Sequence, residues 1–180
     1  MNNLFCAPPD FVTIDNKQYK INTDFRVWID ISNVLDQKIS IKEKLCFMLV
    51  NAYCDKLPEH MGDAINALFD FMNMNENNTK SLSGEKVIDF CCDKNLIYAA
   101  FLQQYRINLF HDYLHWWEFL SLLSCLDENT ALMRVIGYRS VDCSKIKDEN
   151  KKRFFRKMKK RYQLKQEIDD NSIADILTKL

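Results

Sequence analysis

The chain has 180 residues, of which 47% are hydrophobic, and equal numbers of acidic and basic residues give it a formal net charge of zero. This length predicts one domain with a substantial core, and no apolar run approaches the roughly 20 residues that a membrane-spanning helix needs. Seven cysteines, an odd number without a Cys-x-x-Cys pair, indicate free thiols in a reducing cytoplasm rather than a disulfide framework.

The charge is distributed unevenly along the sequence. Residues 134–165 contain 13 Lys and Arg against 3 Asp and Glu, a net charge of +10, which leaves −10 for the rest of the chain. The chain therefore divides into a basic stretch, residues 134–165, and an acidic remainder. Such a division is informative about partners and not about the fold.

The N-terminal residues predict a flexible end followed by a β-hairpin. A Pro-Pro pair blocks regular structure in residues 1–10. Apolar and polar residues then alternate over 11–14 and over 19–22, and the polar residues 15–18 between them predict a turn. Because an isolated hairpin is only marginally stable, we expect it to pack against helices.

From residue 23 onward, apolar residues recur at three- and four-residue spacing, which predicts helices. Thr23 or Asp24 can cap the first helix, Ser40 can cap the second, and Pro58 fits the first turn of a third. The Asn-, Ser- and Thr-rich stretch from about 73 to 84 predicts a mobile loop.

The second half of the chain predicts four more helices. Ser83 can cap a long helix from about 85 to 105, and the next, 113–126, is apolar almost all round, which indicates deep burial or an interface. A short helix from 129 should stop near Gly137.

A basic helix then runs from about 145 to 162, and residues 163–180 form a tail with a short helix. The predicted fold class is therefore mainly α: six or seven helices in one compact bundle with a short N-terminal β-hairpin, over residues 11–162.

Several motifs occur in an order that resembles a known family. The motifs are the segment from Ile14 to Trp28, the aromatic run Tyr98–Tyr105, the pair Trp116-Trp117, Gly137-Tyr-Arg-Ser-Val-Asp142, and the basic run Arg153–Tyr162. On these residues the chain is similar to the gene-product-fifteen proteins of tailed bacteriophages and of prophages of Gram-positive bacteria, over nearly its whole length.

The resemblance implies a place in tail morphogenesis rather than a chemistry. Members of this family are encoded between the tail-tube and tape-measure genes of long-tailed phages, the position of chaperones that coat the tape-measure protein until the tube polymerises around it. We therefore expect a non-enzymatic tail-assembly chaperone that binds the tape-measure protein in the cytoplasm of the bacterial host and is absent from the mature virion. The tail-tube protein and a second copy of the chain are further candidate partners.

Two helices supply the candidate partner-binding residues. These are Trp116, Trp117, Phe119 and Leu120 from the apolar helix, and Phe154, Phe155, Arg156, Met158, Lys159 and Tyr162 from the basic one. The same aromatic residues could instead be core. The eight Lys and Arg between 151 and 161 could also grip phosphates. A nucleic-acid-binding regulator and a minor structural tail protein therefore remain alternatives, although nucleic acid is the less expected partner and a membrane is not expected.

Residue patterns typical of catalysis or metal binding are weak. His111 and His115 are four residues apart and could share a metal ion, but no His-Glu-x-x-His pattern accompanies them. Only three glycines are present, and none belongs to a phosphate-cradling pattern. We therefore expect no catalytic residue, no cofactor and no bound metal.

Overall fold

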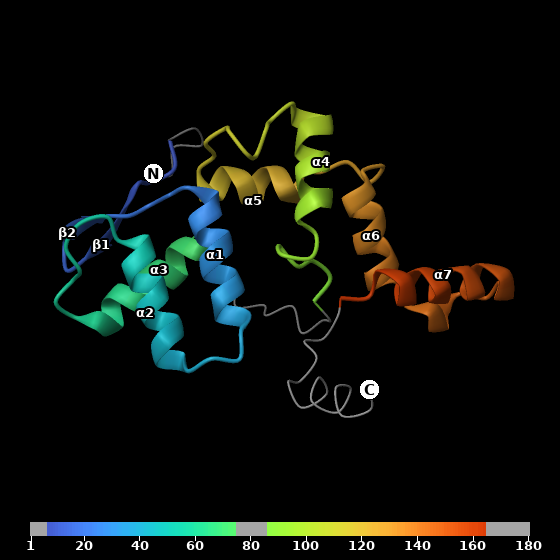
Figure 1. Ribbon diagram of the computed structural model, residues 1–180, viewed down its shortest axis with the longest axis horizontal. Helices are drawn as coiled ribbons and strands as arrows, with labels where there is room; N and C mark the ends of the chain where they lie inside the picture. Colours follow the sequence, from blue (N-terminus) through green and yellow to red (C-terminus); the bar gives the residue numbers. More distant parts are fainter. Residues whose placement is uncertain (1–6, 75–85, 165–180) are drawn as a thin grey trace, which may run out of the picture.

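The computed structural model describes residues 7–74 and 86–164 and is mainly α-helical (Figure 1). The predicted fold class is confirmed, with seven α-helices and one β-hairpin among the described residues. Ser83, most of the predicted loop 73–84 and the predicted C-terminal helix lie outside them. The elements follow in the order β1 (Phe11–Ile14), β2 (Lys17–Lys20), α1 (Phe25–Asp36), α2 (Ile41–Ala52), α3 (Met61–Met72), α4 (Lys94–Tyr105), α5 (Trp116–Ser124), α6 (Ala131–Ser140), the short 3-10 helix η1 (Cys143–Lys145) and α7 (Glu149–Tyr162).

The hairpin has a tighter turn than the sequence pattern predicts. β1 and β2 pair antiparallel with Ile14 opposite Lys17, so that only Asp15 and Asn16 connect them. Both residues have positive φ, 49° and 60°, as a type I′ turn requires and as Asp and Asn tolerate. The predicted turn over 15–18 was therefore too long, and β2 begins and ends two residues earlier than predicted.

The segment after β2 connects the ends of two helices. The amide of Asn22 donates to the carbonyl of Ala52 at the end of α2 (2.7 Å), and the amide of Trp116 at the start of α5 donates to the carbonyl of Thr23 (2.8 Å). These backbone bonds fix residues 20–25 between α2 and α5, which brings the hairpin and α5 into one packed body.

Side-chain caps set the starts of the first two helices. Asp24 caps α1, and Ser40 caps α2 in a capping box with Glu43, as the sequence predicted. The prediction for Pro58 was wrong, because α3 begins at Met61 and Pro58 lies buried in the preceding loop.

The start of α4 differs more strongly from the prediction. Helix α4 begins at Lys94 rather than near residue 85. The carboxylate of Asp89 accepts the backbone amides of Cys91 (3.0 Å) and Cys92 (2.7 Å). These bonds cap a turn that starts at Asp89, in which the amide of Asp93 donates to the carbonyl of Asp89 at 2.8 Å, and α4 begins only after this turn.

The bounds of the last two helices also differ from the predicted ones. Helix α6 continues through Gly137 to Ser140, because Tyr138 and Arg139 beyond the glycine make contacts that hold the last turn in place. Helix α7 begins at Glu149 rather than near 145, after the separate 3-10 turn.

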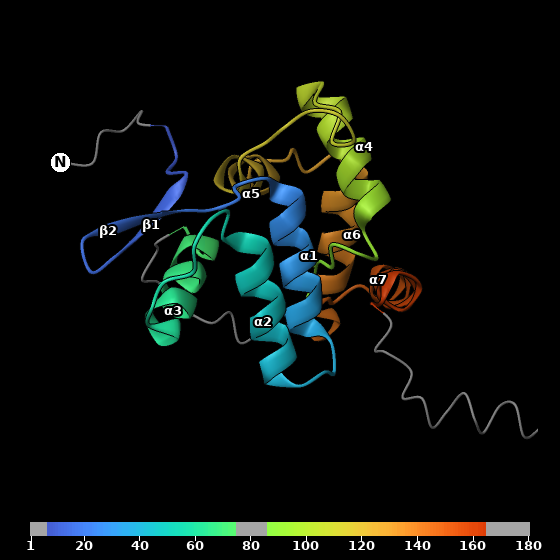
Figure 2. The ribbon, with the colours of Figure 1, turned by 60° about the vertical axis from the view of Figure 1, so that its left-hand side comes forward.

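Aromatic rings fill the centre of the body. Phe119 of α5 is fully buried and stacks on Phe25 of α1 and Phe101 of α4, with ring centroids 4.8 and 5.2 Å apart. Trp28 of α1 is also fully buried and lies against Phe71 of α3 at 4.8 Å. In Figure 2, α1 and α2 lie side by side while α5 crosses near the start of α1.

Helix α7 lies at the edge of this body. Its main contacts are with α6 and η1, and Figure 1 shows it extending outward at the end opposite the hairpin. We call α7 the basic arm, because it contains eight Lys and Arg between residues 151 and 161.

Candidate partner-binding site

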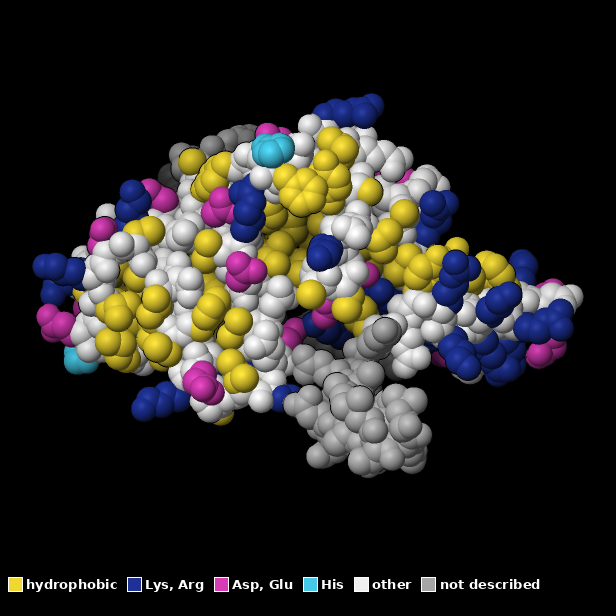
Figure 3. Space-filling model, in the orientation of Figure 1, with side chains coloured by type: hydrophobic (Ala, Val, Ile, Leu, Met, Phe, Trp, Pro, Cys, Tyr) yellow, Lys and Arg dark blue, Asp and Glu magenta, His cyan; other side chains and the backbone are white. Residues whose placement is uncertain are grey.

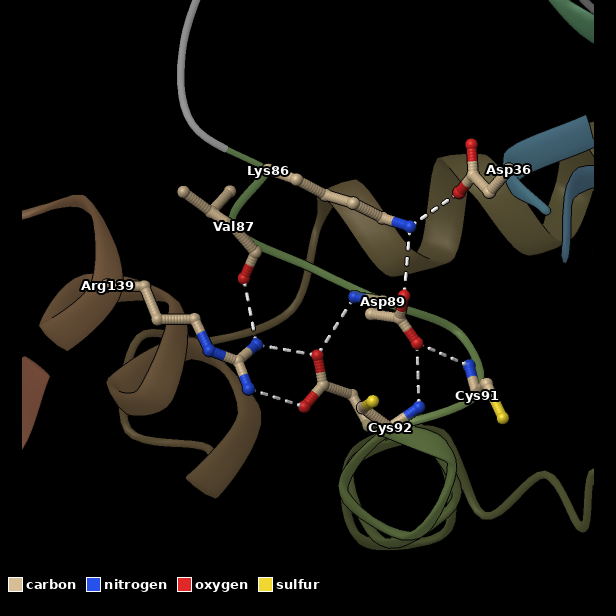
Figure 4. Close-up of polar contacts among 8 residues, drawn as sticks. Asp36, Lys86, Val87, Asp89, Cys91, Cys92 and Arg139 are labelled. Carbon is tan, nitrogen blue, oxygen red and sulfur yellow. Dashed lines mark hydrogen bonds and ion pairs between the residues drawn. The ribbon is translucent and has the colours of Figure 1, made fainter. Parts of the chain in front are cut away.

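Arg139, in the last turn of α6, holds three segments together at the base of the basic arm. Its guanidinium forms a bidentate ion pair with Asp93 (2.6 and 2.9 Å) and donates to the carbonyl of Val87 at 2.9 Å (Figure 4). Its Nε donates to the carbonyl of Tyr162, at the end of the arm, at 2.6 Å. Arg139 is 8% exposed and Asp93 is 2% exposed, so losing either partner would leave a buried charge unpaired.

Asp89 organises the segment between this ion pair and α1. Besides the two amides described above, its carboxylate accepts from the ammonium of Lys86 at 2.9 Å, and Lys86 also pairs with Asp36 at the end of α1 (Figure 4). Burial raises the pKa of the Asp89 carboxyl, but the amide of Cys92 and the charge of Lys86 outweigh that effect and lower the pKa to about 2. The base of the arm is therefore tied to α1 as well as to α4.

Tyr138 of α6 packs against the aromatic residues of the arm. Its ring stacks on Tyr162, with centroids 5.8 Å apart and planes at 17°, and lies 6.2 Å from the rings of both Phe154 and Phe155. Phe155, Met158 and Tyr162 are half-buried, whereas 48% of Phe154 is exposed. One aromatic residue of the arm, Phe154, therefore remains exposed.

The outward side of the arm is cationic. Lys152 is half-buried and pairs with Glu149 at 3.5 Å, whereas the exposed residues Arg156, Lys157 and Lys160 form no hydrogen bond or ion pair with any residue that the structure describes. Figure 3 shows dark blue side chains along α7 with apolar ones between them. This outward side is therefore solvated in the free protein.

A shallow, open hollow of about 510 Å³ lies beside the arm, between η1 and α7. Arg156, Lys159 and Lys160 line it, together with the carboxylate of Asp142. The hydroxyl and the amide of Ser144 donate to Asp142 at 2.6 and 2.9 Å, and these bonds lower the pKa of its carboxyl. With three cations and one carboxylate, the hollow is suited to an anionic group.

The candidates on α5 divide between core and surface. Trp116 and Phe119 are 2% and 0% exposed and belong to the core, so they do not form a binding surface in this structure. Trp117 and Leu120 are half-buried. The indole N–H groups of Trp116 and Trp117 donate to the last two backbone carbonyls of α3 at 3.0 and 2.7 Å. This adjacent pair therefore satisfies the end of a helix.

Exposed aromatic residues lie instead on the loop between α4 and α5, which the sequence interpretation did not single out. Phe110 is 69% exposed and packs beside Tyr98 at 4.5 Å, and Tyr113 is 60% exposed. Arg26 of α1 donates to two carbonyls of this loop, at 2.8 and 2.9 Å, and holds it in place. We call Phe110 and Tyr113 the loop aromatics; residue type alone does not distinguish an exposed Phe from a core Phe.

His115 acts as a helix cap. Its Nδ1 accepts the amide of Trp117 at 3.1 Å, which leaves Nε2 to donate to the carbonyl of Pro9 at 3.1 Å. Within residues 7–74 and 86–164, no group of three or more His, Cys, Asp or Glu side chains could hold a metal ion. In the same part of the chain, no helix combines the length and the apolar character needed to cross a bilayer.

The comparisons with known proteins agree with the sequence motifs. A family model described as Bacteriophage Gp15 protein matches residues 8–164, which places this α-helical chain among bacteriophage proteins. The chain belongs to the bacteriophage Gp15 family, and the resemblance drawn from its motifs is confirmed. No curated protein and no solved structure matches it. Two of those motifs, 137–142 and 153–162, pack against each other at the base of the basic arm.

Proposed function

We propose that the chain is a tail-assembly chaperone that binds the tape-measure protein, without catalysis, while the phage tail is built. Membership of the Gp15 family supports a role in phage morphogenesis. The observation that carries the proposal is that apolar side chains remain exposed on a frame that is otherwise firmly packed and hydrogen-bonded. Apolar side chains that gather into a patch on the surface of a folded protein are typical of sites that hold another polypeptide, whereas single ones occur on any surface.

These exposed side chains form separate groups. Figure 3 shows apolar side chains over α2 and the start of α3, near the α4–α5 junction, and along α7. The large ones that are at least 38% exposed are Ile39, Ile41, Val50, Leu57, Met61, Leu102, Phe110, Tyr113 and Phe154.

Several small apolar contacts suit a temporary coat better than one large interface does. Apolar burial contributes about 25 cal/mol per Å², from which the cost of ordering both partners must be subtracted. Each contact would therefore be weak, while many copies along one tape-measure chain would bind with avidity. Tail-tube subunits could then displace the copies one at a time, in the host cytoplasm, before the virion is complete.

Co-expression with the tape-measure protein of the same phage tests this proposal. We expect more soluble tape-measure protein and its co-elution with this chain, and a smaller gain with the variant Phe110→Ser. The control Ser121→Ala changes an exposed side chain on neighbouring α5 without removing an apolar one, and it should behave like the wild type. No gain in soluble tape-measure protein, with both proteins intact, would contradict the proposal.

Two alternatives make different predictions. The cations of the basic arm favour a nucleic-acid-binding regulator, which should shift labelled DNA or RNA in a strongly salt-dependent way. A minor structural tail protein should be found in purified virions by mass spectrometry, whereas an assembly chaperone should be absent from them.

A further inference from the structure

We propose that the basic arm is a docking site for an acidic helical segment of a partner protein. This rests on the proposed function, because it names the surface and the chemistry of one partner contact. The segment we infer has Asp or Glu residues along one side and an apolar residue at its edge. The argument uses the charge of the arm, the position of its exposed aromatic residue and the distribution of charge over the chain.

Like charges are crowded on the outward side of the arm. Arg153, Arg156, Lys157 and Lys160 recur at three- and four-residue spacing, which brings them next to one another on the helix surface. Like-charged neighbours at this spacing destabilise a helix. Among the described residues no carboxylate forms an ion pair with Arg156, Lys157 or Lys160, and Asp142 in the hollow pairs with Lys145. A row of carboxylates on a partner would replace this repulsion with attraction.

The arm is held firmly enough to serve as a preformed surface. Arg139 bonds to its last residue, Tyr162, through the backbone carbonyl, and Tyr138 stacks on the ring of the same residue. Asp148 caps its first turn by accepting the amide of Lys151 at 2.7 Å. A partner therefore need not first order the helix, which lowers the cost of binding.

The positions of the side chains suggest how a helix would lie. With 3.6 residues per turn, the hollow at Arg156 and Lys160 lies along one flank of the arm, and Phe154 lies along the other. Arg153 and Lys157 lie between these flanks. A bound helix would place a carboxylate in the hollow, further carboxylates over the cations, and an apolar side chain against Phe154, which is 48% exposed.

The charge of the whole chain favours a short acidic segment over nucleic acid. Outside residues 134–165 the chain carries a net charge of −10. A long polyanion passing over the body would meet this negative charge, whereas a segment confined to the arm would not. Nucleic acid is therefore the competing outcome of the experiment below.

Binding to two labelled probes tests the proposal at physiological ionic strength. The first is a helical peptide as long as the arm, with glutamates four residues apart and leucines along one edge; the second is a single-stranded DNA of similar length. Fluorescence anisotropy compares the wild type with the double variant Arg156→Glu/Lys160→Glu. The matched control is Lys17→Glu/Lys20→Glu, which makes the same charge change on β2 at the opposite end of the molecule (Figure 1).

We expect the acidic peptide to bind the wild type and the β2 variant about equally, and the arm variant at least about tenfold more weakly, because two facing cations become anions. Equal binding by the arm variant, or tighter binding of the DNA than of the peptide, would overturn the proposal. Circular dichroism and thermal unfolding of each variant verify that the helices remain.

Co-expression of the same variants with the tape-measure protein separates this inference from the proposed function. If the wild type and the arm variant solubilise the tape-measure protein equally well, the chaperone function stands. In that case the arm is not the site at which the chaperone binds an acidic segment of the tape-measure protein. If the wild type gives no soluble tape-measure protein but binds the acidic peptide through the arm, the chaperone function fails and the docking site stands.

Discussion

The two aromatic groups of the molecule contain the same residue types but have opposite environments. Around Phe119, rings from α1, α4 and α5 stack on one another and exclude water. Around Tyr138, the rings that the described residues supply come from α6 and α7 alone, and Phe154 remains 48% exposed. The number of elements that converge on a ring, rather than the ring itself, decides whether it becomes core or surface.

Truncating one ring from each group is the strongest test of whether the two groups differ in packing. Phe119→Ala should lower the free energy of unfolding by about 3–5 kcal/mol, because it leaves a large cavity in a closely packed core. Phe154→Ala should cost less than about 1 kcal/mol, as is usual for a partly exposed side chain. Urea denaturation followed by circular dichroism measures both, and similar losses would show that the arm is as tightly packed as the body.

Removing the connection between the two regions should have the next largest effect. Arg139→Met leaves Asp93 buried without its partner, which we expect to cost about 3 kcal/mol and to loosen the arm. Arg139→Lys retains the charge but loses the planar fork, so its cost should be smaller. Urea denaturation gives the stability of each variant, and the rate of tryptic cleavage within the arm reports its attachment.

Arg134→Met is the matched control for this prediction, since Arg134 lies on the same helix but is exposed. It should change the free energy of unfolding by less than about 0.5 kcal/mol. If trypsin cleaved the arm of Arg139→Met no faster than the arm of this control, the aromatic contacts with Tyr138 alone would hold the arm in place.

Local sequence patterns predicted the fold where local interactions determine it. The cap residues Asp24 and Ser40 marked the starts of α1 and α2 because a cap bonds within its own turn. The predicted helix from residue 85 failed because Asp89 bonds the amides of the following residues, which periodicity does not reveal. Gly137 did not end α6, because the residues after it are held by tertiary contacts.

The site was less predictable than the fold. The basic arm and its aromatic residues were identified from composition and spacing, and they do lie together on α7. Arg139 was missed because its partner Asp93 is 46 residues earlier in the chain and no local pattern joins them. Trp116 and Phe119 were candidates for partner binding with the core as the alternative, because periodicity shows that a helix is apolar all round but not what covers it, and the structure places both in the core.

Because of the network at the base of the arm, the free energy of unfolding should decrease as the pH falls into the acid range. The pKa of Asp89 is lowered in the folded state to about 2 from an ordinary value of 3.8, so its contribution is present above about pH 4 and is lost as the pH falls toward 2. The difference in unfolding free energy between the wild type and Asp89→Asn should therefore be constant from neutral pH to about pH 4 and shrink below it. Denaturant titrations at several pH values test this, with exposed Asp30→Asn as the control; a difference that persists to pH 2 would contradict it.

The smallest expected effect bears most directly on whether the arm is a binding surface or merely a solvated one. Arg156→Glu places a carboxylate three or four residues from Lys152, Arg153 and Lys160, so like-charged pairs become opposite pairs. We expect the free energy of unfolding to rise by about 0.5 kcal/mol at low salt, and this gain to shrink as salt screens the charges. Thermal unfolding at low and high salt measures the gain, with Lys17→Glu on β2 as the control. If the variant is more stable but binds the acidic peptide more weakly, the crowded charges of the arm destabilise its own helix while they favour binding. This combination is expected of a binding surface and is not required of a solvated face. Lower stability at low salt, or a gain that salt leaves unchanged, would show that the charges on the arm do not repel one another as its spacing implies.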